Sequence, residues 1–222
     1  MTSMLAATAL IRWNMLKIMY KTYLYIDGTN LFAGQNELFG PKSHISFKFL
    51  IQQINKLIKI DQIHFYASYM NKRSFSTNKK NHASPKLKDL MAAEALFYRE
   101  VFQTKDVIFY KGHRSPTSGK EKGVDVHLSV DIVRDVFFKK CSRVVVMTGD
   151  ADLIYPLEVV KLLKIPTAAV FLPNRFSLEM SYKVNQAFVL NFGNKFKVDR
   201  KLPKQLKVIA QKKPRMVNIR GK

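Results

Sequence analysis

The stretch Arg143–Asp150, with the sequence RVVVMTGD, decides the fold. Its valine-rich run has the length and composition of a strand, and Thr-Gly-Asp closes it with a turn. A second apolar run, Thr22–Ile26 (TYLYI), is stopped in the same way by Asp27 and Gly28. Both runs therefore predict buried strands that end in polar turns.

Working outward from these two runs, strand and helix patterns alternate along the chain. Further strands are predicted at Ile63–Tyr69, Val107–Tyr110, Thr167–Leu172 and Phe188–Leu190. Helices are predicted at Ser46–Lys59, from Ser84 to Phe102, and at Val124–Lys139, Leu153–Leu163 and Phe176–Lys183. In the third helix, Val126, Val130, Val133 and Phe137 are expected to form the apolar face.

Such alternation predicts an α/β fold, a Rossmann-like three-layer α/β/α arrangement with a mainly parallel sheet of five to six strands. The 222 residues suit one domain with extensions. We expect that domain at residues 22–192, after an N-terminal extension (1–21) and before a basic C-terminal tail (193–222). The extension is either a helix or the result of a mis-assigned start. The tail has the composition of a partly disordered, nucleic-acid-binding arm.

The charge balance is unusual, with 38 Lys and Arg against 16 Asp and Glu and a net charge of +22. Residues 1–22, 72–88, 111–123 and 195–222 carry the whole excess, and the rest of the chain is neutral. Such runs can be merely solvated surface, but a polyanion such as nucleic acid is the expected partner. Residues 1–20 contain Arg12 and Lys17 and predict no membrane span.

Several common chemistries are excluded by their missing motifs. The single Cys141 leaves no disulfide framework, Cys₄ zinc site or CxxC pair, and it favours a reducing, cytoplasmic setting. Gly112–Lys120 has the wrong glycine spacing for a Walker loop, and no GxGxxG follows the first strand. The five histidines show no metal-ligand spacing.

Acidic residues follow the two deciding strands directly. In a sheet of order 3-2-1-4-5, strands 1 and 4 are neighbours whose connections leave in opposite directions, which makes the crevice at their carboxyl ends the ligand site. Asp27 and Asp150 would flank that crevice, and Asp125 opens the helix leading back to strand 4. Helix capping is the alternative role for each, above all for Asp152. Clustered carboxylates repel one another unless a cation joins them, and hard oxygen ligands suit Mg²⁺ or Mn²⁺.

Three segments resemble the NYN domain family of PIN-like, metal-dependent ribonucleases: Tyr25–Phe32 (YIDGTNLF), Glu121–Asp135 (EKGVDVHLSVDIVRD) and Val144–Lys164 (VVVMTGDADLIYPLEVVKLLK). The resemblance covers roughly residues 22–192. It implies a PIN fold, a divalent-metal site and hydrolysis of RNA. Asp27, Asp125 and Asp150 would be the catalytic, metal-binding carboxylates and Asp152 a supporting metal ligand. Asn30 would brace the loop of Asp27, and Lys122 would meet a substrate phosphate.

Asp131 matches a further acid of the family. It lies six residues after Asp125, about 240° round a helix of 3.6 residues per turn, so we do not expect it at the same ion. Two departures from the family pattern are Leu153 in place of Phe and Asn185-Gln186 in place of an acid before the last strand.

The sequence thus favours an endoribonuclease acting on single-stranded RNA, or a broader single-strand nuclease, that uses Mg²⁺ or Mn²⁺. The resemblance to the family implies a 5′-phosphate product. The basic residues expected to bind RNA are Lys72, Arg73, Lys79, Lys80, Lys120 and Lys122. Two alternatives stay open: a catalytically weak RNA-binding module, and the toxin of a toxin–antitoxin pair with an acidic protein partner. The sequence leaves the oligomeric state open, with a homodimer as one possibility, and no membrane partner is expected.

Overall fold

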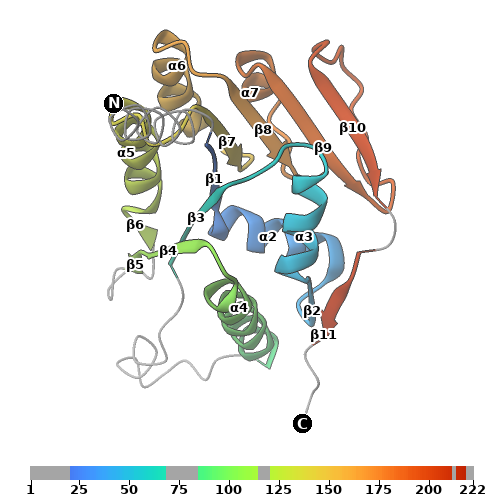
Figure 1. The fold of residues 1–222 in the computed structure, drawn as a ribbon. Helices are drawn as coiled ribbons and strands as arrows, with labels where there is room; N and C mark the ends of the chain where they lie inside the picture. Colours follow the sequence, from blue (N-terminus) through green and yellow to red (C-terminus); the bar gives the residue numbers. More distant parts are fainter. Residues whose placement is uncertain (1–20, 69–84, 115–120, 212–213, 219–222) are drawn as a thin grey trace, which may run out of the picture.

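The computed structural model describes residues 21–68, 85–114, 121–211 and 214–218. Its central feature is a seven-stranded sheet in which every pair of neighbouring strands is parallel, in the order β10-β9-β8-β7-β1-β3-β4 (Figure 1). The strands in this order are Leu206–Gln211, Gln186–Phe192, Thr167–Phe171, Arg143–Met147, Thr22–Asp27, Gln62–Ala67 and Val107–Lys111. The predicted α/β class and the order of the first five strands are confirmed.

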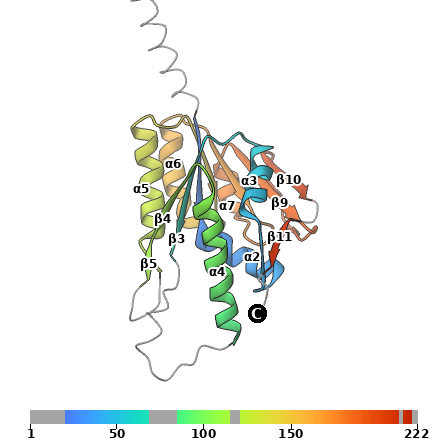
Figure 2. The same cartoon turned by 60° about the horizontal axis from the view of Figure 1, so that its bottom comes forward.

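Helices cover both faces of this sheet, which gives the predicted three layers (Figure 2). One core packs α2 (Gly28–Phe39), α3 (Phe47–Asn55) and α4 (Pro85–Gln103) on side chains such as Leu24 and Phe65. The other core packs α5 (Val124–Phe137), α6 (Ile154–Leu162) and α7 (Leu178–Lys183) on the opposite face. A short 3₁₀ helix, η2 (Ala151–Leu153), leads into α6. No helix in the described ranges is long and apolar enough to cross a membrane.

Two short ribbons complete the fold. β2 (Ser43–Ile45) pairs antiparallel with β11 (Met216–Asn218), and β5 (His113–Arg114) pairs antiparallel with β6 (Glu121–Lys122). The second ribbon precedes α5 directly and so lies at the carboxyl edge of the sheet, where the strands end.

The sheet has seven strands where the sequence predicted five to six. The additional strand is β10, which comes from the segment predicted to be a basic tail. Because β10 is the edge strand, its side chains Lys207 and Val208 are exposed, and the segment does not look like a buried strand. Composition alone therefore could not separate this edge strand from an arm.

Helix α2 was not predicted at all. Its sequence, GTNLFAGQNELF, carries two glycines and two asparagines, which are typical of turns. The helix forms because its cap and its packing outweigh these weak propensities: Asp27 caps the first turn, and Leu31 and Phe32 are buried in the core.

The predicted apolar face of α5 was also wrong. Val124, Leu128, Ile132 and Val136 face the sheet and are buried. Val126, Val130 and Phe137 point away from it and are 65%, 57% and 70% exposed. The helix carries apolar side chains on two faces, so periodicity alone did not determine which face is buried.

Candidate functional site

The direction in which the chain adds successive strands to the sheet reverses between β1 and β7. From β1 the chain runs outward to β3 and β4, and it then returns to β7 on the other side of β1. Ile26 pairs with Met147, so the next residues on the two strands, Asp27 and Thr148, lie side by side at the carboxyl edge. This is the switch point at which open α/β sheets bind ligands.

Asp27 is buried, with 4% of its surface exposed, and both its oxygens accept hydrogen bonds. Its Oδ1 accepts from the Asn30 backbone N at 2.9 Å, the capping bond of α2. Its Oδ2 accepts from the Thr148 hydroxyl at 3.1 Å. The helix cap and the threonine therefore fix the orientation of this carboxylate.

Asp150 is attached to the same network. Its backbone N donates to Thr148 Oγ1 at 3.0 Å, and its own Oδ1 accepts from the Asp152 backbone N at 3.0 Å, which caps η2. The Gly149 N donates to Asn30 Oδ1 at 3.1 Å. We call these five residues, Asp27, Asn30, Thr148, Gly149 and Asp150, the switch-point network.

Two glycines allow the network to form. A Cβ at Gly28 would lie 2.2 Å from the Phe65 ring, and one at Gly149 would lie 2.4 Å from the carbonyl oxygen of Arg175. Both distances are far below van der Waals contact. The Asp-Gly and Gly-Asp pairs of the sequence therefore reflect close approach at the switch point as much as turn formation.

Asp125 and Lys122 reach the same edge from α5 and its preceding ribbon. Asp125 is in the first turn of α5 and is exposed. Gly123 between them has φ 80°, a left-handed conformation that glycine adopts without strain. Asp152 is exposed within η2. The acids predicted for the site thus all stand at the carboxyl edge, where Asp27 and Asp150 are joined through Thr148.

The donors of this edge fit a hard divalent cation. Carboxylate oxygens are the ligands that Mg²⁺ and Mn²⁺ prefer. Within the described residues, no group of three or more His, Cys, Asp or Glu side chains is arranged to hold an ion. Among the described residues these side chains therefore form no closed protein cage, and a Mg²⁺ or Mn²⁺ ion held there would keep several waters.

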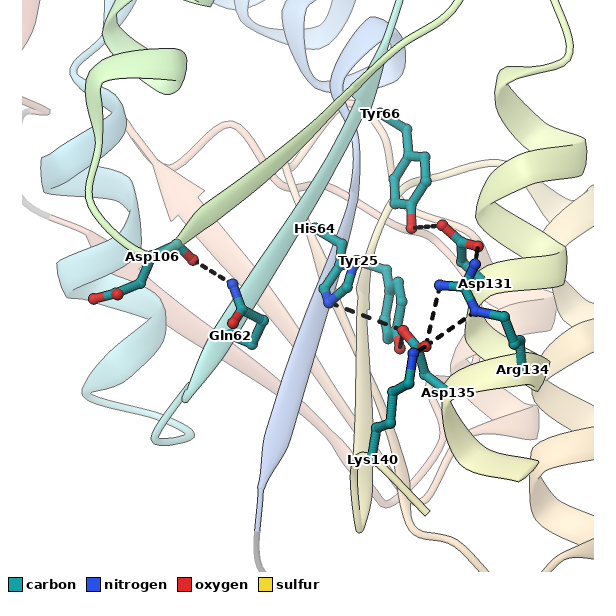
Figure 3. Close-up of polar contacts among 9 residues, drawn as sticks. All are labelled: Tyr25, Gln62, His64, Tyr66, Asp106, Asp131, Arg134, Asp135 and Lys140. Atoms are coloured by element: carbon teal, nitrogen blue, oxygen red, sulfur yellow. Dashed lines mark hydrogen bonds and ion pairs between the residues drawn. The ribbon is translucent and has the colours of Figure 1, made fainter. Parts of the chain in front are cut away.

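A second polar cluster lies deeper along α5 (Figure 3). Asp135, which is 1% exposed, accepts hydrogen bonds from the Tyr25 hydroxyl and from the Arg134 and Lys140 side chains, each at 3.1 Å. Because two cations and a hydroxyl meet it, this buried carboxylate is compensated. Burial first of all, together with the charge on Asp135, raises the pKa of Tyr25. The cluster ties α5 to the sheet.

Asp131 belongs to this second cluster and not to the switch-point network. Its Oδ2 accepts from the Tyr66 hydroxyl at 2.8 Å, and its Oδ1 lies 2.6 Å from Arg134 Nη1. Burial and the bond to Asp131 raise the pKa of Tyr66. The helix arithmetic that separated Asp131 from Asp125 agrees with these contacts.

His64 is buried beside this cluster and stacks on Tyr25, with ring centroids 4.9 Å apart. Its Nε2 lies 3.9 Å from Asp135 Oδ2, and among the described residues it has no hydrogen-bond partner. Burial lowers the pKa of His64 in spite of the opposing effect of Asp135. Burial therefore favours the neutral form of the imidazole.

The structure bears on only some of the predicted RNA-binding residues. Lys122 is exposed on β6. The others, Lys72, Arg73, Lys79, Lys80 and Lys120, lie outside the described residues. Thr148 was assigned no role from the sequence. The signal that would have revealed it is its position directly after a central strand, opposite Asp27.

Comparison with known proteins gives the family. A family model described as the NYN domain matches residues 21–188, so the chain belongs to the NYN domain family, a family of PIN-like nucleases. The resemblance in the three sequence segments is thereby confirmed.

Among solved structures, the chain is similar to the crystal structure of a protein of unknown function from Vibrio parahaemolyticus. The TM-score is 0.53 and the sequence identity 13%, over 81% of this chain and 96% of that one. At this identity the match shows the fold alone. A search among curated proteins finds no match.

Proposed function

We propose that the protein is a metal-dependent endoribonuclease that hydrolyses single-stranded RNA at the switch-point network. The observation that carries this proposal is the pair of bonds made by Thr148 Oγ1, which donates to Asp27 and accepts from the Asp150 backbone. A hydroxyl shared in this way holds two acidic residues at one point of the sheet. Membership in the NYN family adds the nuclease class.

The acidic residues would bind the metal ion needed for hydrolysis. Asp27 and Asp150, with Asp125 and Asp152 beside them, would hold Mg²⁺ or Mn²⁺. The bound cation would supply an activated water and stabilise the leaving oxygen. Water adds to phosphorus while the bond from phosphorus to the 3′ oxygen breaks, which gives a 5′-phosphate and a 3′-hydroxyl.

Substrate binding would rest on the basic residues around this acidic edge. Lys122 precedes Asp125 by three residues and is exposed, so its ammonium can meet a phosphate next to the scissile one. Lys72, Arg73, Lys79, Lys80 and Lys120 would add phosphate contacts farther along the strand. The basic residues would attract the RNA phosphates, and the acidic residues would form the site of cleavage.

One observation favours a second candidate, a catalytically weak RNA-binding module. Among the described residues no three metal-ligating side chains form a preassembled ion site. If substrate phosphate does not complete the coordination, the fold would serve as a basic platform that binds RNA without cutting it.

Cleavage assays distinguish the two functions. The purified protein is incubated with a panel of single-stranded RNAs and DNAs, with Mn²⁺, with Mg²⁺ and with EDTA, beside the Asp125→Asn variant. A nuclease gives products with metal only, and the variant gives few or none. Tight binding without product from any RNA under every metal condition would instead establish the binding module.

A further inference from the structure

The outer face of α5 and α6 exposes large apolar side chains. On these helices, or directly after them, Tyr155 is 75% exposed, Phe137 70% and Phe138 63%. The aliphatic side chains exposed on the same helices or directly after them are Val126, Val130, Leu162 and Leu163. A groove of about 580 Å³ runs between the two helices. Its lining is mostly apolar and includes Val130, Phe137 and Tyr155, together with the polar side chains of Ser129, Arg134 and Asp152. We call this surface the α5–α6 face.

This apolar area is large for the surface of a monomer. Aromatic side chains cover about 150–250 Å² each, so the three aromatics alone expose roughly 300–500 Å². The largest apolar patch of a monomer is typically about 300–600 Å² in total, and the four aliphatic side chains add to the area here. Each partner of a standard interface contributes about 800 Å². The α5–α6 face therefore approaches the area that a stable interface needs.

The charge distribution indicates which partner fits. Residues 124–165, which include α5 and α6, contain six acidic and six basic side chains and are neutral, although the whole chain carries +22. A polyanion would be drawn to the basic segments elsewhere. The net charge of the chain repels a second copy of itself. This electrostatic repulsion is smallest where the two copies approach through a neutral part of the surface.

We propose that the α5–α6 face is the interface of a homodimer, in which α5 and α6 of one copy pack on the same helices of the second. A two-fold axis makes such a contact self-complementary. The face offers both parts that this requires, since Phe137 and Tyr155 project while the groove between the helices can receive side chains. The assignment does not depend on the proposed nuclease activity, although Asp152, one of the acids proposed to hold the cation, lines the same groove.

The test is the mass of the full-length protein in solution, measured by light scattering and sedimentation over a wide concentration range. The variant carries both Phe137→Glu and Tyr155→Glu, which place two charges in the proposed interface. The matched control is Phe102→Glu on α4, because Phe102 is also 75% exposed but lies on the other side of the sheet. Circular dichroism and thermal melting verify that all proteins fold.

We expect the wild type and Phe102→Glu to be dimers. The double variant should be a monomer, with a dimer dissociation constant raised roughly 100-fold or more, as expected when two central aromatic contacts are lost. A dimer that persists in the double variant would overturn the proposal. A monomeric wild type would also overturn the proposal. This holds even if hydrogen exchange showed that residues 1–20 protect the α5–α6 face.

Discussion

Thr148 donates its hydroxyl hydrogen to Asp27 Oδ2 at 3.1 Å, across 121 positions of the chain. The same oxygen accepts from the Asp150 backbone N at 3.0 Å. One uncharged side chain, 3% exposed, thus connects Asp27, the last residue of β1, with Asp150, which follows β7. If the site is catalytic, Thr148 is a positioning residue whose removal should disturb both acids.

Replacing Thr148 by valine keeps its shape and removes both bonds. We expect cleavage to fall about 10–100-fold, the usual cost of losing an outer partner of a metal ligand. The Mn²⁺ concentration for half-maximal activity should rise. Titrating the metal in a cleavage assay measures both effects.

Thr148→Ser is the matched control for this change, because serine keeps the hydroxyl. It should retain most of the activity. Equal losses of activity in the serine and valine variants, with an unchanged requirement for Mn²⁺, would show that the bonds of Thr148 do not serve the site.

Gly149→Ala should damage both stability and activity. The new Cβ would lie 2.4 Å from the carbonyl oxygen of Arg175, a backbone atom that cannot move aside alone. We expect the free energy of unfolding to fall by about 1–3 kcal/mol, the usual cost of overpacking, together with a loss of cleavage. Urea unfolding and a cleavage assay measure the two.

Gly40→Ala separates this clash from simple backbone strain. Gly40 has φ 84°, and a Cβ there would meet no atom within 4 Å. It should cost about 1–3 kcal/mol, because φ 84° with ψ 170° is a conformation that essentially only glycine adopts, and it should leave cleavage intact in the folded protein. Normal cleavage by folded Gly149→Ala would contradict the role given to the close approach.

The buried imidazole of His64 should make stability depend on pH. Its pKa is lowered from 6.5 in the folded protein, mainly by burial; Asp135 and Asp131 oppose this effect, and Arg134 and Lys140 support it. Below about pH 6.5 the unfolded chain binds the proton more readily. The free energy of unfolding should therefore fall as pH falls, by up to about 1.4 kcal/mol per pH unit, until the folded imidazole is also protonated.

The measurement is urea unfolding of wild type, His64→Phe and His127→Gln between neutral and mildly acidic pH. His127→Gln is the matched control, because His127 is exposed on α5. His64→Phe should flatten it. The same pH slope in His64→Phe and wild type would assign the effect to other groups.

Lys122 should contribute one phosphate contact to RNA binding. Lys122→Ala is expected to weaken binding to all sequences alike and to reduce the slope of log K against log salt by about 1. Lys59→Ala is the matched control, because Lys59 is exposed just before β3, at the opposite edge of the sheet. Equal salt slopes for both variants would show that Lys122 makes no phosphate contact with the RNA. Fluorescence anisotropy without metal measures these constants.

The sequence predicted the central part of the fold because its strands are valine-rich and fully buried. β7 was predicted at Arg143–Met147, as observed, and β1 differs by one residue. The order of strands around the switch point followed from the alternation of strands and helices. These elements carry their signal locally, which is why they could be found.

The elements that were missed depend on contacts distant in sequence. α2 forms because of its Asp27 cap and its burial, in spite of its turn-like composition. β10 is an edge strand recognisable only through its pairing with β9. The buried face of α5 could not be chosen from periodicity, because Val126 and Val130 continue an apolar pattern onto the exposed side.

In the candidate site, too, some features could be predicted from the sequence and others could not. Asp27 and Asp150 could be predicted, because an acid directly after a central parallel strand lies at the carboxyl edge. The bonds of Thr148 and the approach of Arg175 to Gly149 could not, because they arise when distant segments meet.

The most direct test of the central claim is the cleavage of single-stranded RNA by purified Asp150→Asn beside the wild type, with Mn²⁺, together with RNA binding by both. The amide keeps the shape of the carboxylate and removes its charge. We expect cleavage to be abolished while RNA binds as tightly as before or more tightly, because one negative charge near the phosphates is gone. Cleavage at the wild-type rate by Asp150→Asn would contradict the assignment of the switch-point network as a nuclease site.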